Sequence, residues 1–106
     1  KESNSILILK GMTLERMDKL NDAMELYKKA FHKSPKILYR SEEKNIMKIV
    51  GYITLQTVVG EKEKALAEFK KLKEKKMSES EKQYINSIEP IIRNYKGGGY
   101  NGLGKK

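Results

Sequence analysis

The sequence contains no cysteine and only one histidine, His32. The absence of cysteine excludes disulfide bonds and any chemistry that depends on a thiolate. Because no cluster of cysteine and histidine has the spacing of a zinc site, a metal ion would need carboxylate ligands, alone or together with His32. We therefore expect neither a metal nor another cofactor, and we expect His32 to be a surface residue.

Proline and long apolar runs are scarce as well. Two prolines in 106 residues, with no dense glycine or proline tract before residue 96, favour continuous helices. The apolar run at 6–9, ILIL, is too short for the core of a signal peptide or for a membrane span. We expect a soluble protein, with the cytoplasm favoured; a chain that begins at Lys1 rather than Met is also compatible with a removed N-terminal signal.

Positive charge is what the chain has in excess. Its 23 Lys and Arg residues outnumber 14 Asp and Glu residues, which gives a net charge of +9. Such an excess attracts nucleic acid, anionic lipid or an acidic protein. The length fits one small domain with a modest core.

Apolar residues recur at helical spacing over five segments, which predicts an all-α fold. The predicted helices cover about 4–17, 21–33, 42–59, 62–76 and 79–95. Their ends carry recognisable signals: Asn21 and Ser41 at N-termini, Gly60 as a terminator, and a capping box of Ser78 with Glu81.

The C-terminal part of the chain departs from this pattern. Pro90 should kink the fifth helix or end it early. Residues 96–106, KGGGYNGLGKK, have no periodicity and are predicted to form a flexible, basic, glycine-rich tail. The GGGYNG stretch lacks the preceding strand, the following helix and the G-K-S/T ending of a phosphate-binding loop.

An alanine followed four residues later by an aromatic residue occurs twice, as Ala23 with Tyr27 and as Ala65 with Phe69. Each pair follows a helix of similar length and a short turn. The small residues would let the two helices of a hairpin approach closely, and the aromatic rings would fill the space towards the next hairpin. The pattern predicts two antiparallel helix hairpins stacked side by side.

These residues resemble the tetratricopeptide repeat, whose pattern runs W-x2-L-G-x2-Y, then A-x3-F, then P. The first copy matches at Leu7, Gly11, Leu14, Ala23, Tyr27, Ala30 and Pro35, with Lys10 in an apolar position. The second copy matches at Gly60, Ala65, Leu66, Phe69 and Leu72, and less well at Ile49, Tyr52, Ile53 and Gln56. The copies lie 42 residues apart, from Ala23 to Ala65, against about 34 in the family.

The resemblance implies a divergent module of α-solenoid type over 4–95. Its first repeat would cover about 4–35, its second about 42–77, and a capping helix about 79–95. A generic five-helix bundle is the alternative interpretation.

Such modules bind a peptide or helix of another protein on a concave face, lined by the first helix of each hairpin. Carried onto this chain, the resemblance implies a partner groove of Ile8, Met12, Glu15, Met47, Val50, Thr54 and Thr57. Ile8 and Met12 stand where a carboxylate clamp would need Lys and Asn. The resemblance therefore implies an apolar ligand rather than an acidic chaperone tail. The alternative is that the fifth helix covers these residues.

Two basic clusters offer a different hypothesis. They comprise Lys28, Lys29, Lys33, Lys36 and Arg40, then Lys70, Lys71, Lys73, Lys75 and Lys76. If both lie on one edge, they would form a patch for nucleic acid or a membrane surface, with Tyr39, Tyr95 and Tyr100 able to stack on bases. The simpler interpretation is that lysines favour helix C-termini and solvated faces.

No serine, histidine and aspartate set, nucleophile elbow or credible carboxylate pair occurs, so we do not expect an enzyme. The favoured hypothesis is a protein-binding module. A basic nucleic-acid-binding domain and a self-associating structural domain are the alternatives.

Overall fold

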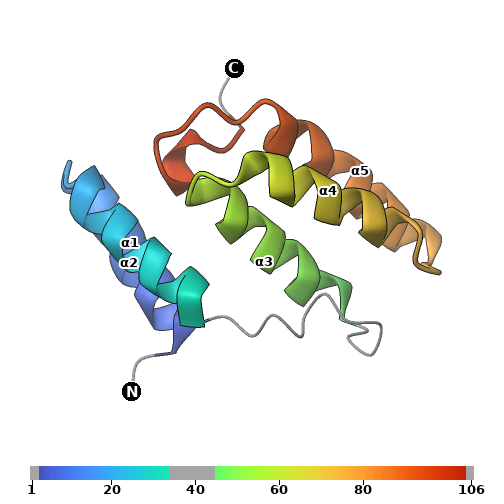
Figure 1. Cartoon of the computed structure of the whole chain (residues 1–106), viewed down its shortest axis with the longest axis horizontal. Helices are drawn as coiled ribbons and strands as arrows, with labels where there is room; N and C mark the ends of the chain where they lie inside the picture. The colour runs from blue at the N-terminus through green and yellow to red at the C-terminus, as the bar shows by residue number, and fades with distance from the viewer. Residues whose placement is uncertain (1–2, 34–44, 105–106) are drawn as a thin grey trace.

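The computed structural model describes residues 3–33 and 45–104, and within these ranges the regular secondary structure is entirely helical (Figure 1). The elements are α1 (Asn4–Arg16), α2 (Leu20–Lys33), α3 (Ile46–Val58), α4 (Lys62–Lys73), α5 (Glu79–Arg93) and the short 3-10 helix η2 (Tyr100–Gly102). The predicted all-α class is confirmed.

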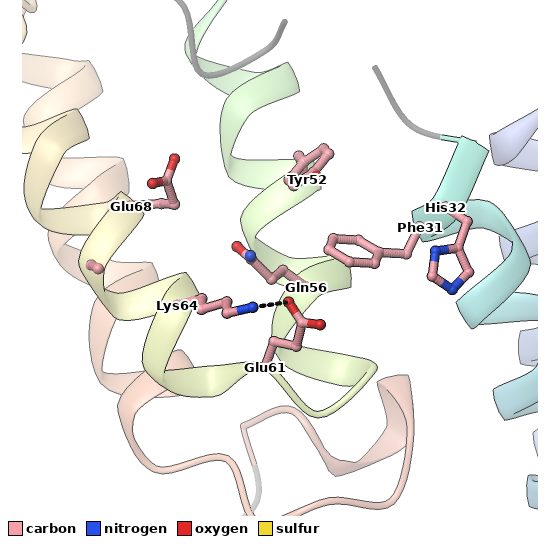
Figure 2. Close-up of a pocket in the computed structure, with 8 residues that line it drawn as sticks. Phe31, His32, Tyr52, Gln56, Glu61, Lys64 and Glu68 are labelled. Atoms are coloured by element: carbon pink, nitrogen blue, oxygen red, sulfur yellow. Dashed lines mark ion pairs between the residues drawn. The ribbon is translucent and has the colours of Figure 1, made fainter. Parts of the chain in front are cut away.

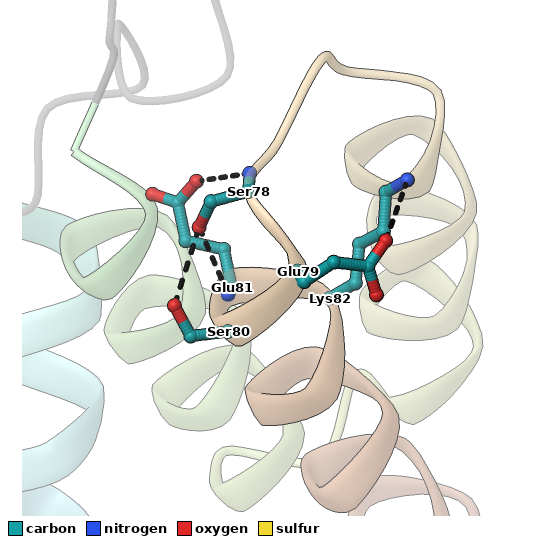
Figure 3. Close-up of polar contacts among 5 residues, drawn as sticks. All are labelled: Ser78, Glu79, Ser80, Glu81 and Lys82. Atoms are coloured by element: carbon teal, nitrogen blue, oxygen red, sulfur yellow. Dashed lines mark hydrogen bonds and ion pairs between the residues drawn. The ribbon is translucent and has the colours of Figure 1, made fainter.

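Two of the predicted helix-end signals are confirmed and two are wrong. Gly60 follows the end of α3 with a positive φ of 101°, as expected of a terminator. Ser78 and Glu81 form the predicted capping box: each side chain accepts a hydrogen bond from the other residue's backbone N–H (Figure 3). In contrast, α2 begins at Leu20, so Asn21 lies inside the helix. Helix α3 is capped by Asn45 instead of Ser41, which lies outside the described residues.

Helices α1 and α2 form a closely packed antiparallel hairpin (Figure 1). A Cβ atom on Gly11 would overlap the ring of Tyr27, so only glycine permits this approach. Ala23, Tyr27 and Ala30 are fully buried. The Tyr27 ring, which was expected to fill the space towards the next hairpin, thus packs against Gly11 of its own hairpin.

Helices α3, α4 and α5 share a second, apolar core, which consists of Ile46, Ile49, Val50, Ile53, Ala65, Phe69, Leu72, Ile85 and Ile92. Helix α5 packs on both α3 and α4. It continues past Pro90 and ends at Arg93, two residues before the predicted end. The Lys62 ammonium then donates hydrogen bonds to the carbonyl oxygens of Arg93 and Tyr95, at 3.0 and 3.2 Å.

The two units meet through α3 and the C-terminal segment. Leu55 and Val58 of α3 join Tyr95 in a cluster with Leu7, Ala23, Tyr27 and Ala30 of the first hairpin. The prediction of a flexible tail did not anticipate that residues 96–104 return to α1 and α2, where η2 contacts α1 (Figure 1). Lys105 and Lys106 lie outside the described residues.

Candidate binding groove

A groove of about 560 Å³ opens between α1, α3 and α5, with η2 at its wall. The residues that line it are Asn4, Ser5, Ile8, Met47, Lys48, Val50, Gly51, Tyr52, Thr54, Leu55, Tyr84, Ile88 and Tyr100. Four of the seven predicted groove residues are among them: Ile8, Met47, Val50 and Thr54. We call this site the α1/α3/α5 groove.

Helix α3 supplies the centre of the groove. Met47, Val50 and Thr54 are spaced by three and four residues, so they share one face of the helix. Val50 is only 2% exposed, whereas Met47 is 60% exposed. The Thr54 hydroxyl donates to the Val50 carbonyl at 2.8 Å, so its donor is already satisfied. The face is therefore mainly apolar and is accessible at its Met47 end.

The other three predicted residues do not line the groove. Met12 is half-buried on α1. Thr57 is fully buried, and its hydroxyl donates to the Ile53 carbonyl at 2.9 Å. Glu15 is 8% exposed and is bound internally. Placing Thr57 and Glu15 where a partner could touch them was therefore wrong, because the packing of the two units takes up both side chains.

Glu15 holds the C-terminal loop instead. Its carboxylate accepts hydrogen bonds from the Tyr27 hydroxyl, from the Tyr100 N–H at 2.9 Å and from the Asn101 N–H at 3.0 Å. The Tyr27 and Tyr100 rings meet edge to face with their centroids 4.9 Å apart. We call this arrangement the Glu15 clasp. It joins α1 to a loop 85 residues further along the chain.

The glycine run makes the clasp possible. Gly97, Gly98 and Gly99 all have positive φ, at 111°, 91° and 68°. A Cβ on Gly99 would also overlap the Glu15 carboxylate. The run thereby aims two successive backbone N–H groups at one anion, as in a backbone nest. The loop does bind an anion, but the anion is an internal carboxylate and not a phosphate.

Burial and the nearby Glu15 carboxylate keep the tyrosine hydroxyls around the clasp protonated. Burial, followed by the hydrogen bond to Glu15, raises the pKa of Tyr27 well above its usual value. Burial and the Glu15 charge likewise raise the pKa of Tyr100, and burial raises that of Tyr95. Tyr27 is therefore a permanent hydrogen-bond donor to Glu15.

A sequence signal for the clasp existed. Leu7, Gly11 and Glu15 are spaced by four residues, so an acidic residue continues the buried face of α1. A carboxylate on such a face requires buried donors. The sequence does not say that Tyr27 and the loop after Gly99 supply them.

A second cavity of about 520 Å³ lies between α2, α3 and α4 (Figure 2). It is lined by Phe31, His32, Tyr52, Gln56, Glu61, Lys64, Ala67 and Glu68. Phe31 points towards Tyr52, with ring centroids 5.3 Å apart (Figure 2). Lys64 lies 3.9 Å from Glu61, and Lys71 lies 3.4 Å from Glu68, so both carboxylates have internal counter-charges. His32 is exposed.

The described residues of the two basic clusters do not form one patch. Lys28, Lys29 and Lys33 are exposed on α2. The second cluster occupies the last turn of α4 and the residues that follow it. In Figure 1 the C-terminal ends of α2 and α4 lie far apart, so the proposed common edge was wrong. Lys36, Tyr39 and Arg40 lie outside the described residues.

The positive charge of the second cluster is also partly neutralised by ion pairs. Lys73 forms an ion pair with Glu89, which also binds Arg93. The hydrogen bond from Lys73 is the main reason that the pKa of Glu89 is lowered. Of the rest of this cluster, Lys70 and Lys76 are exposed and Lys75 is half-buried.

Tyr95 and Tyr100 were expected to be able to stack on bases. Tyr95 is 7% exposed and donates to the Gly99 carbonyl at 3.1 Å. Tyr100 is packed against Tyr27. The Tyr95 ring is therefore not accessible to a base, whereas Tyr100 is half-buried and lines the α1/α3/α5 groove.

Comparison of the chain with models of known families, with curated proteins and with solved structures finds no match. Across the described ranges, no helix has the length and apolarity to cross a membrane. Nor do three histidine, aspartate or glutamate side chains come together as metal ligands there.

Proposed function

We propose that this protein is an interaction module, not an enzyme, and that it binds an apolar segment of another protein in the α1/α3/α5 groove. The observation that carries the proposal is the groove itself. Ile8, Val50 and Ile88 come from three different helices and line one apolar cavity. Cavities of roughly 300–1,000 Å³ with mainly apolar walls are typical of binding sites.

The proposal includes a tetratricopeptide-like architecture. It is supported by the close approach at Gly11 and by the burial of Ala65 and Phe69 in the second hairpin. The origin of the groove walls supports it too, because α1 and α3 are the first helices of the two hairpins.

Helix α5 acts as a wall of the groove in this proposal and not as its cover. Tyr84 and Ile88 of α5 line the cavity and are only half-buried. Met47, which lines the groove from α3, keeps 60% of its surface exposed. An apolar side chain with that exposure beside an apolar cavity is available to a partner.

The test compares two methionines. Met47 lines the groove and is 60% exposed; Met17, 55% exposed, does not line it. The tagged protein should retain a partner from source lysate after nuclease treatment and washing in about 0.5 M salt, where charge interactions act over only a few ångströms. Met47→Asp should lose that partner, and Met17→Asp should keep it. Val50 is unsuitable because an aspartate there would be buried.

Circular dichroism of both variants verifies that the helices are intact. If nuclease or salt removes everything that is bound, the basic surface is the binding surface and the proposal is wrong. Equal behaviour of Met47→Asp and Met17→Asp also contradicts it.

A further inference from the structure

The α1/α3/α5 groove has an unbalanced charge. Among the residues that line it, Lys48 is the one charged side chain. Lys48 is exposed on α3, next to Met47. Within the described part of the chain, no carboxylate forms an ion pair with it.

The second cavity provides the contrast. There, Glu61 and Glu68 are lining residues, and each carboxylate lies beside a lysine. The second cavity is thus lined by side chains of both charge signs, whereas the charged residue that lines the groove is a lysine. A positive side chain beside an apolar cavity attracts a partner of opposite charge and repels a basic one.

The walls of the groove favour a helix over an extended peptide. They are made of α1, α3 and α5, whose backbone groups already bond within each helix. An extended segment would find no sheet edge and would leave its own N–H and C=O groups without partners against an apolar surface, which is costly. A helix satisfies these groups internally and presents an apolar stripe.

We infer that the partner of the α1/α3/α5 groove is an acidic amphipathic helix, whose apolar stripe enters the cavity and whose carboxylates face Lys48. The inference rests on the proposed function and adds the charge and the secondary structure of the partner. The apolar stripe supplies most of the affinity, and Lys48 supplies selectivity and faster association.

Two synthetic helical peptides test it, each about 16 residues or ~24 Å long. Both carry the same leucine stripe, with glutamates on the polar face of one and lysines on that of the other. Binding to the full chain is followed by fluorescence anisotropy at low salt and at about 0.5 M salt. The acidic peptide should bind about tenfold more tightly at low salt, and the preference should shrink as salt is added.

Lys48→Glu should weaken the acidic peptide roughly fivefold, as the loss of a single partly exposed ion pair does, and should leave less preference between the peptides. The matched control is Lys29→Glu, which makes the same charge change at an exposed position on α2, away from the groove. It should have less than half of that effect. Equal effects of the two variants would show that net charge selects the peptide, and would overturn the role of Lys48.

Met47→Asp separates this inference from the proposed function. If both peptides bind equally well and Met47→Asp weakens both, the groove binds helices without selecting acidic ones: the inference fails and the proposed function stands. If neither peptide binds, or if Met47→Asp changes nothing, both fail. A preference that Met47→Asp removes together with binding supports both.

Discussion

The two halves of this molecule are stabilised by different means. The unit of α3, α4 and α5 is closed by a continuous apolar core that includes Phe69 and Ile53. The hairpin of α1 and α2 also packs closely, but it is joined to the C-terminal loop by a buried carboxylate, Glu15, with three donors. One half therefore depends on burial of apolar area, and the other depends in addition on one hydrogen-bonded site.

The difference matters because the two kinds of interaction lose stability in different ways when a side chain is changed. An apolar core loses stability in proportion to the volume removed. A buried carboxylate that loses its donors, or donors that lose their carboxylate, carry the full desolvation cost. The groove lies between the two halves, with Ile8 on one wall and Val50 on another, so both kinds of interaction hold its shape.

The largest expected effect comes from removing a large side chain from the apolar core of α3, α4 and α5. Phe69 is 1% exposed, and Phe69→Ala should lower the free energy of unfolding by about 3–5 kcal/mol. Urea unfolding followed by circular dichroism measures this. Phe31→Ala, at a half-buried position on α2, should cost less than half as much. A loss under about 1 kcal/mol at Phe69 would mean that this core does not stabilise the α3–α5 unit.

The Glu15 clasp should give an intermediate effect. Glu15→Gln keeps the size of the side chain but brings an N–H₂ group against groups that are all donors. We expect a loss of about 1–3 kcal/mol. Faster hydrogen exchange at the Tyr100 and Asn101 amides should accompany it, since their acceptor is weakened or lost. Unchanged exchange at both amides would contradict the clasp.

The clasp can also be tested from the loop, by a substitution at Gly99 with Gly104 as the control position. Gly99 and Gly104 both have positive φ, at 68° and 79°. A Cβ on Gly99 would overlap Glu15, whereas a Cβ on Gly104 would meet nothing within 4 Å. Gly99→Ala should reproduce the exchange pattern of Glu15→Gln. Gly104→Ala should show only the cost of backbone strain, about 1 kcal/mol.

Several features of the fold and of the groove could be predicted from the sequence. The helices were predictable from the spacing of apolar residues, because residues at helical spacing are buried together when the segment forms a helix. Ser78 with Glu81 was predictable because a capping box is local. The groove residues Ile8, Met47, Val50 and Thr54 came from matching a repeat pattern, and the structure brings them to one cavity.

The features that the sequence did not reveal depend on contacts between residues that are far apart along the chain. The glycines at 97–99 looked like a flexible tail because glycine permits many conformations. Contacts with Glu15 and with the Tyr95 hydroxyl hold the loop in one of them. Glu15 itself looked accessible because the sequence does not show where the C-terminal loop packs. Without that loop, the face of α1 that carries Glu15 cannot be distinguished from the face that lines the groove. The basic clusters looked like one patch because spacing along the chain does not give the angle between α2 and α4.

The smallest expected effect is an acid-dependent one in the α3–α5 unit. Glu89 of α5 binds Lys73 of α4 and Arg93, and its pKa is lowered below the ordinary 4.5. Because the folded pKa lies below the unfolded one, the pair stabilises the fold above pH 4.5 and loses this contribution as pH falls through the folded pKa. Both Lys73 and Glu89 are partly solvated, so the contribution is at most about 1 kcal/mol.

Glu89→Gln should therefore lower the melting temperature by a few degrees at about pH 7 and by almost nothing at about pH 2.5. Glu25→Gln, the same change at an exposed position on α2, should show little difference at either pH. A deficit for Glu89→Gln that persists unchanged in acid would mean that packing of the side chain, and not its charge, fastens α5 to α4. The α3–α5 unit would then depend on apolar contacts alone, and its contrast with the Glu15 clasp would be sharper.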